Sequence, residues 1–417
     1  MIRIIAKKEI LEQVSSYRFA ILSGMLLLII GVSIFVSYGD FLARSENYTL
    51  NHPEPHSSNI MIRPTPFSLF AKGMDTFLGR MYYLKYSGIE VQGAEQSVDR
   101  LFSLFTQPDM LFIVRVLLSL IALLFTFDAI TGEKEMGTLR LAAIAGGERM
   151  SLLAGKLTGR VLVVVIPFSF LFVAGALVVS LLAGIQVSAD YWIRMAAFLA
   201  AADEYIVVFC AIGIFLSTMV HRSSSALALC LGVWVTFVFI VPESGMLLAR
   251  VVSDVPPGER VEMQGRLATI RGIYEKIQRE GDNGSPEGWR RLVAEARMAN
   301  SQLIDSYAPK LERHVDITKD FERCSPAGCV TMVLTDLMGT GLFEERRFKN
   351  SVSSFFERNY DIISEVKNGE LEEYRYPRAP VDEIFTSGAL TDLFILACFG
   401  LLFIGGALYG FFRYDLR

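Results

Sequence analysis

Six stretches of the chain consist almost entirely of apolar residues. Residues 19–38, 161–185 and 393–412 contain no charged side chain at all. A helix needs about 20 apolar residues to cross the ~30 Å hydrocarbon core of a bilayer. Buried helices of soluble proteins are seldom so long and so uniformly apolar. The pattern therefore predicts helices that span a membrane.

Three further stretches, residues 111–130, 195–220 and 223–241, are long enough as well, although the first two contain charged residues. We therefore predict an all-α polytopic membrane protein with six transmembrane helices. The predicted spans are residues 18–38, 110–130, 161–185, 193–220, 223–249 and 387–413.

Polar segments connect the spans. Residues 1–17 mix apolar and charged positions, which fits either a helix lying along the membrane interface or a plain tail. We expect the interfacial helix. In residues 39–109 the Pro-rich first half should be extended and the second half should form an amphipathic helix. Residues 131–160 form the longest connection on the other side of the membrane.

Residues 250–386 are numerous enough to form a domain of their own. Residues 260–279 and 286–311 are rich in Glu, Arg and Ala and are separated by a turn-like Asp-Asn-Gly-Ser-Pro segment, so an antiparallel pair of helices is the simplest prediction. A further helix is expected at residues 343–366. The sequence thus predicts a mainly helical domain between the last two spans.

Basic residues in the short connections set the orientation. The N-terminal tail, residues 131–160, the connection at Arg222 and the C-terminal tail all contain Lys or Arg, whereas residues 186–192 contain neither. We therefore expect both termini in the cytoplasm and residues 39–109 and 250–386 outside it. The first apolar run exceeds the roughly 7–15 residues of a signal peptide, which favours a retained anchor.

Composition and residue spacing argue against two kinds of ligand, nucleic acid and metal ions. The chain is 52% hydrophobic with a mean hydropathy of +0.40, and its net charge of −4 includes no basic domain. Nucleic acid is therefore not an expected partner. The four histidines have no zinc-ligand spacing with the cysteines, so no metal site is expected.

The cysteines leave one alternative open. Cys210, Cys230 and Cys398 fall within predicted spans, where they serve most simply as small apolar residues. Cys324 and Cys329 lie in the segment predicted to be outside the cytoplasm, where a disulfide is allowed. A Pro-Ala-Gly turn between them would bring them together. Two free thiols are the alternative.

The connection after the second span carries the most specific motif. Residues 132–139 read Gly-Glu-Lys-Glu-Met-Gly-Thr-Leu, and Arg149 and then Gly155-Lys156 follow. This pattern resembles that of ABC-2 type permeases, the membrane-spanning subunits of one class of ATP-binding-cassette (ABC) transporters. Residues 145–148 depart from it, because many members have a Pro and a Ser or Thr before the Arg. The resemblance implies the ABC-2 (type V exporter-like) fold.

The resemblance also implies a role for the motif, which is to dock a separate ATPase on the cytoplasmic side. Charged groups there would fix the orientation of the two proteins. An ordinary solvated loop is the alternative. The residues to which the resemblance gives this role are Glu133, Glu135, Gly137, Thr138, Arg149 and Lys156.

The chain itself lacks an ATP site of the usual kind. Lys156 is followed by Leu157, and no Gly precedes Gly155 by five residues, so there is no Walker A sequence. We expect no enzymatic activity and no bound cofactor in this chain. ATP and Mg²⁺ would be held by the partner ATPase.

Charged residues inside the predicted spans need an explanation, because each costs about 2.5–3.5 kcal/mol in a helix centre. Asp203 and Glu204 lie near the middle of the fourth span, and Arg115 lies in the second. Arg115 and Arg194 are candidate partners for the two acids. These groups line a substrate path or form a structural pair between helices.

Taken together, the predictions describe a multi-pass protein of the cytoplasmic (inner) membrane. We expect a permease dimer, formed with a second copy or a related chain, bound to two ATPase subunits. The large insertion between the last two spans resembles the subgroup of gliding-motility and copper-enzyme-maturation permeases. One alternative is a scaffold or sensor whose outer domain binds a protein partner. An intramembrane enzyme is a weaker alternative, since no second catalytic group is evident.

Overall fold

The computed structural model describes residues 1–51, 56–85, 88–91, 108–138, 149–182, 188–253, 312–363 and 369–413, with a few isolated positions between 254 and 311. Within these residues, six helices are long and apolar enough to span a membrane. They are Tyr17–Asn51, Met110–Met136, Arg149–Leu182, Ala189–Met219, Ser223–Ala249 and Val381–Arg413. The prediction of six transmembrane helices is thereby confirmed.

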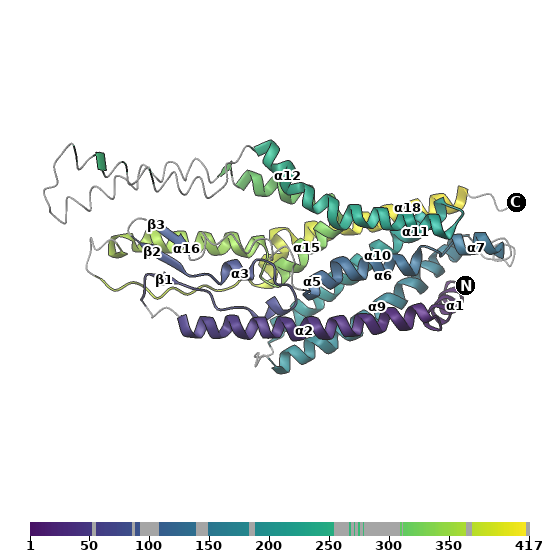
Figure 1. The fold of residues 1–417 in the computed structure, drawn as a ribbon, viewed down its shortest axis with the longest axis horizontal. Helices are drawn as coiled ribbons and strands as arrows, with labels where there is room; N and C mark the ends of the chain where they lie inside the picture. Colours follow the sequence, from purple (N-terminus) through teal and green to yellow (C-terminus); the bar gives the residue numbers. More distant parts are fainter. Residues whose placement is uncertain are drawn as a thin grey trace.

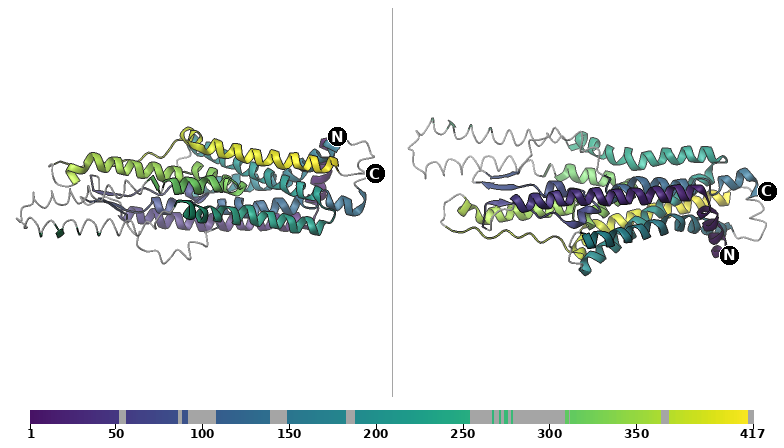
Figure 2. Two further views of the ribbon diagram at one scale, coloured as in Figure 1. Left: turned by 90° about the horizontal axis from the view of Figure 1, so that it is seen from above. Right: turned by 60° about the horizontal axis from the view of Figure 1, so that its bottom comes forward.

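The spans run side by side in an elongated bundle (Figures 1 and 2). Helices α2 (Tyr17–Asn51), α9 (Arg149–Leu182) and α10 (Ala189–Met219) are each continuous. Helix α10 lies at the centre, where it packs against α6 (Ser119–Thr126), α9 and α18 (Leu390–Arg413). Its large aromatic side chains Phe198, Tyr205 and Phe209 are fully buried.

The other three spans each contain a π-helical turn. The second span consists of α5 (Met110–Phe112), η2 (Ile113–Leu118) and α6. The fifth consists of α11 (Ser223–Val235), η3 (Thr236–Ile240) and α12 (Val241–Ser253). The sixth consists of α17 (Val381–Ile384), η4 (Phe385–Ala389) and α18. Gly388 in η4 has a φ of 141°, which a side chain would oppose.

Helix α2 is longer than expected. The sequence predicted a loop from residue 39, but the helix continues to Asn51. Arg44 explains much of the extension, because it pairs with Asp40 one turn earlier, at 2.9 Å, and also with the buried Asp75. Pairs of opposite charge four residues apart stabilise a helix. The helix therefore continues past its apolar part as a polar segment with charged residues.

The end of the bundle far from the chain termini carries a small lobe, here called the distal lobe (residues 59–91 and 342–376). Strands β1 (Asn59–Ile60), β2 (Tyr82–Lys85) and β3 (Gly88–Val91) form an antiparallel sheet in that order, with Tyr83 opposite Glu90. The sheet packs on α16 (Leu342–Ile363). The 3₁₀-helix η1 (Pro66–Leu69) and helix α3 (Asp75–Leu78) lie between β1 and β2 in the chain.

Aromatic side chains form the core of the distal lobe. The Phe348 ring lies edge-on to Tyr82 at 5.1 Å and to Tyr376 at 5.2 Å. Burial raises the pKa of Tyr82 to about 12. The predicted helix at 343–366 is confirmed by α16, whereas the sheet was not predicted. The predicted pair of helices at 260–279 and 286–311 lies outside the described residues, as does the amphipathic helix expected before the second span.

Helix α15 (Pro326–Leu337) stands where a turn was expected between Cys324 and Cys329. Ser325 accepts a hydrogen bond from the Gly328 amide at 3.1 Å, and Pro326 occupies the first turn, so this segment starts a helix. The helix packs against both α10 and α18. Cys329 is buried in it, while Cys324 is exposed, and both are free thiols. Of the two alternatives, the structure therefore has the thiols and not the disulfide.

Candidate coupling site at the terminal end of the bundle

The motif that follows the second span folds into a short helix, α7 (Thr131–Met136). It lies at the same end of the bundle as α1 (Ile2–Val14) and the end of α18 (Figure 1). Gly137 ends the helix in the left-handed conformation with a φ of 71°, where a Cβ would be strained. Met136, Gly137 and Thr138 are exposed at its tip.

Helix α7 is fixed to the end of α10. The Ser217 hydroxyl accepts hydrogen bonds from the amides of Ile130 and Thr131, both at 3.0 Å. The Lys134 ammonium donates to the carbonyls of Thr218 (2.6 Å) and Val220 (3.0 Å). These carbonyls would otherwise lack partners at the end of a helix, and a cation is favourable there. The two helices thus satisfy each other's free backbone groups.

Glu135 connects α7 to the fifth span. Its carboxylate accepts hydrogen bonds from the Ser223 amide (2.9 Å) and the Ser223 hydroxyl (2.8 Å) in the first turn of α11. A carboxylate at a helix N-terminus pairs with unsatisfied amides and with the positive end of the helix dipole. Glu135 therefore serves as the cap that α11 does not supply from its own sequence.

A buried group of charges connects α7 to α9 and α1. The Lys156 ammonium of α9 lies 2.7 Å from the Glu133 carboxylate and 2.9 Å from that of Glu9 in α1. Arg160, one turn further along α9, lies 3.0 Å from the other oxygen of Glu9. Lys156, Arg160 and Glu9 are each at most 6% exposed. Three elements distant in sequence thus meet at one ionic centre.

The ionic centre extends to the first two spans. Arg160 also donates to Asp128 at 2.5 Å and to the Phe125 carbonyl at 2.6 Å. Asp128 in turn accepts from Arg18 at 2.8 Å. We call the six linked charged residues the ionic cluster. Its three acids balance its three bases. The cluster consists of Glu9, Asp128, Glu133, Arg18, Lys156 and Arg160.

Charge pairing determines the ionisation of Glu9. Burial alone would raise the pKa of its carboxyl, but Lys156 and Arg160 outweigh burial and hold that pKa below its usual value of 4.5. The carboxylate is therefore ionised at neutral pH. A buried pair of this kind tolerates the loss of one partner poorly, because the other charge is left unpaired.

Two glycines allow α1 to approach α9 so closely. A Cβ on Gly155 would lie 2.8 Å from Cβ of Ile5, and one on Gly159 would lie 2.9 Å from the Ala6 carbonyl oxygen. Small residues four apart on one helix face permit such backbone contact. Because the backbones touch, Glu9 can reach both cations of α9.

The structure changes the expectation for the motif residues. Glu133 and Lys156 are brought together inside the chain, where Lys156 is 2% exposed, so Lys156 contacts other parts of the same chain. Arg149 donates to the Phe412 carbonyl of α18 at 2.9 Å. Glu135, Gly137 and Thr138 are exposed. The role of the motif in docking an ATPase stays a prediction.

Sequence reasoning missed most partners of the motif, namely Glu9, Asp128, Arg160 and Ser217. One signal was present in the spacing of Lys156 and Arg160, because basic residues four apart share a helix face and require acidic partners if that face is buried. Glu9 was harder to identify as a partner, because in the sequence it looks like any charged residue of a polar tail.

The charges in mid-membrane are arranged differently from expectation. Arg194 donates to Asp190 (2.8 Å) and to the carbonyls of Leu337 and Ala379 (both 2.7 Å), so it holds the segments that contain these two carbonyls against α10. Asp203 instead lies 3.4 Å from the Ser169 hydroxyl. Among the described residues neither Asp203 nor Glu204 forms an ion pair with Arg194 or with Arg115, so the suggested pairing is wrong.

The six spans and the polar end formed by α1 and α7 define a polytopic membrane protein whose short helix after the second span is braced by its own bundle. Residues 3–310 match the sequence profile of the family described as ABC-2 family transporter protein, and the chain belongs to this family. The predicted resemblance is thereby confirmed. Members of this family are the membrane-spanning permease subunits of ABC transporters.

Two related proteins bear the name probable ABC transporter permease protein NosY. The one from Stutzerimonas stutzeri is 37% identical over 170 residues, which cover 40% of this chain and 61% of the relative. The one from Pseudomonas aeruginosa is 32% identical over 172 residues, covering 41% and 62%. The chain thus spans about three fifths of the length of these relatives.

Proposed function

We propose that this permease works as a dimer with two copies of a separate ATPase and moves or extracts a substrate across the cytoplasmic membrane. ATP and Mg²⁺ would be held by the ATPase, because this chain has no Walker A sequence. The orientation follows the basic residues of the short connections, with α1, α7 and both termini in the cytoplasm. The partner permease is a second copy or a relative.

The observation that carries the proposal is the bracing of α7. This helix continues from the second span, bonds to the fourth through Ser217 and Lys134, and to the fifth through Glu135. Through Glu133 and Lys156 it also bonds to the third. A displacement of α7 therefore acts on four spans at once, as ATP-driven movement in a transporter requires.

The tip of α7 is the part that a partner can reach. Met136 is 70% exposed, and Gly137 and Thr138 beside it are exposed as well. Glu133 and Lys156 lie behind this tip and transmit its movement to α9 and α1. Docking and transmission are thus assigned to different residues of one motif, which makes them separable by mutation.

The docking test uses Met136→Glu. A carboxylate there would lose its water in the interface without a partner, so ATPase recovered with the purified permease should fall by about tenfold or more. Phe77→Glu is the matched control, since Phe77 is 50% exposed on α3 in the distal lobe. Equal recovery with Met136→Glu and with the control would show that α7 does not dock the ATPase.

The transmission test uses Glu133→Gln. This change keeps the shape of the side chain but removes its charge from Lys156, while the exposed tip is unaltered. We expect normal ATPase recovery, with a hydrolysis rate in the complex that resembles that of the ATPase alone. Hydrolysis as in the wild-type complex would contradict the assignment of Glu133.

The family assignment favours transport over a scaffold or sensor role, which would share the docking step but lack substrate movement.

A further inference from the structure

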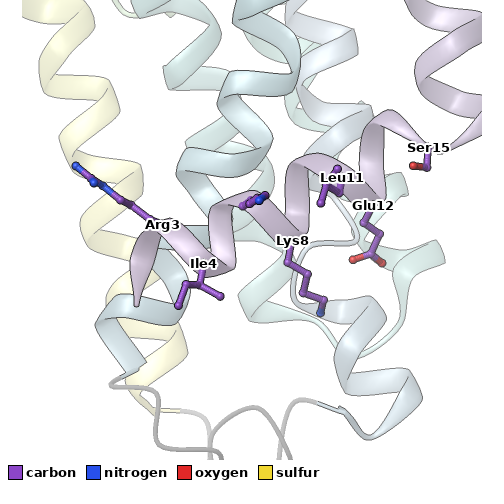
Figure 3. Close-up of a pocket in the computed structure, with 7 residues that line it drawn as sticks. Arg3, Ile4, Lys8, Leu11, Glu12 and Ser15 are labelled. Atoms are coloured by element: carbon purple, nitrogen blue, oxygen red, sulfur yellow. The ribbon is translucent and has the colours of Figure 1, made fainter.

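The two faces of helix α1 have opposite surroundings. On the inner face, Ala6 and Glu9 are buried against α9. On the outer face, Ile4 is 75% exposed and Leu11 is 58% exposed. Figure 3 shows that Ile4, Lys8 and Leu11 project from the same helix, away from the ribbons behind it. The helix therefore presents bulky apolar side chains that the described part of the chain does not cover.

Basic residues border these apolar side chains. Ile4 and Leu11 are seven residues apart and lie on one helix face, and Lys7 and Lys8 occupy its two sides. A shallow pocket follows this face and is lined by Arg3, Ile4, Lys7, Lys8, Leu11, Glu12 and Ser15. With three basic residues and one acid, the face carries a net positive charge. Apolar side chains bordered by lysines are typical of helices lying in a membrane interface.

The connection to α2 holds α1 beside the start of the first span. The Ser16 hydroxyl donates to the Gln13 carbonyl at 2.6 Å and accepts from the Phe19 amide at 3.3 Å, which fixes the bend between the two helices. Tyr17 follows immediately and is 89% exposed at the start of the first span. Tyrosine is enriched at the level of lipid headgroups. The outer face of α1 therefore lies within reach of those headgroups.

We propose that the outer face of α1 is a binding site for anionic phospholipids. Ile4 and Leu11 enter the boundary of the acyl chains, while Arg3, Lys7 and Lys8 contact the phosphate groups. Each basic residue near an anionic membrane surface strengthens binding to that surface by about fivefold. Because Glu9 on the inner face of α1 pairs with Lys156 and Arg160, lipid binding to the outer face would also stabilise the ionic cluster.

The test is a fluorescence-quenching measurement on the full chain. Leu11→Trp serves as the reporter, in a background whose three native tryptophans, Trp192, Trp234 and Trp289, are changed to Phe. The protein is reconstituted in phosphatidylcholine vesicles with equal fractions of dibrominated phosphatidylglycerol or dibrominated phosphatidylcholine. We expect severalfold stronger quenching by the anionic lipid. Lys7→Gln/Lys8→Gln should remove that excess, and Glu12→Gln should increase it, since Glu12 is the one acid lining the pocket.

Native mass spectrometry of the unaltered chain in mixed phosphatidylglycerol and phosphatidylcholine provides a second measurement that needs no reporter. Lys7→Gln/Lys8→Gln should retain fewer phosphatidylglycerol molecules than wild type. Equal quenching by the two brominated lipids, with equal retention, would overturn the headgroup preference. No quenching by either lipid would place the face outside the bilayer and overturn the proposal, leaving this surface to a protein partner.

Discussion

At the scale of the residue, the end of the bundle that holds α1 and α7 depends most on Glu9, because its carboxylate pairs with two buried cations. Glu9→Gln would leave Lys156 paired only with Glu133 and Arg160 paired only with Asp128. The carboxylate that bridges the two cations would be lost. Breaking a buried ion pair from one side costs about 3–5 kcal/mol. We expect a clearly lower unfolding temperature in detergent. Glu12→Gln, on the exposed face of the same helix, should change stability by about 0.5 kcal/mol or less.

The pH dependence of this difference follows from the ionisation of Glu9. Its pKa in the folded protein lies below the usual value of 4.5, so its stabilising effect is complete above that pH and is lost as pH falls through the folded pKa. The gap between wild type and Glu9→Gln should thus be widest near neutrality and close in acid. A gap of constant size down to the lowest pH tested would mean that the charge of Glu9 does not stabilise the fold.

At the scale of the element, the contact between α1 and α9 depends on two glycines of α9, which have no Cβ. A Cβ on Gly159 would lie 2.8 Å from Cβ of Glu9, so Gly159→Ala should push α1 outward and cost about 1–3 kcal/mol. Gly24→Ala in α2 is the matched control, because no atom lies within 4 Å of its Cβ position. That control should be neutral or slightly stabilising, since Ala favours a helix. Thermal unfolding of both variants would decide, and equal effects would refute the close contact.

The elements also show how far the sequence alone could lead. The spans were predictable because their signal is local, about 20 apolar residues in a row. The distal sheet was not, because β2 is stabilised by Phe348 of α16, more than two hundred residues away. Strands of two to four residues carry little pattern of their own. The motif of α7 was found through its resemblance, but its bonds to Ser217 and Lys156 depend on packing that no local pattern encodes.

At the scale of the whole molecule, the distal lobe constrains the topology. It is built from two connections, one before the second span and one before the sixth, and the contact of Tyr82 with Phe348 requires both to lie on the same side of the membrane. The tip of α7 lies at the other end of the bundle (Figure 1). With the basic residues placing α7 in the cytoplasm, the lobe should lie outside it.

Single cysteines in a background without the native five can test this arrangement. Ser58→Cys, directly before β1 of the lobe, and Glu357→Cys, in α16 of the lobe, should react with a membrane-impermeant maleimide in intact cells. Met136→Cys, at the exposed tip of α7, should react only after the cells are permeabilised. Because the two lobe positions belong to one packed unit, they must react together. Reaction at only one of them would contradict the lobe, whereas reaction of Met136→Cys alone in intact cells would reverse the orientation and remove α7 from the reach of a cytoplasmic ATPase.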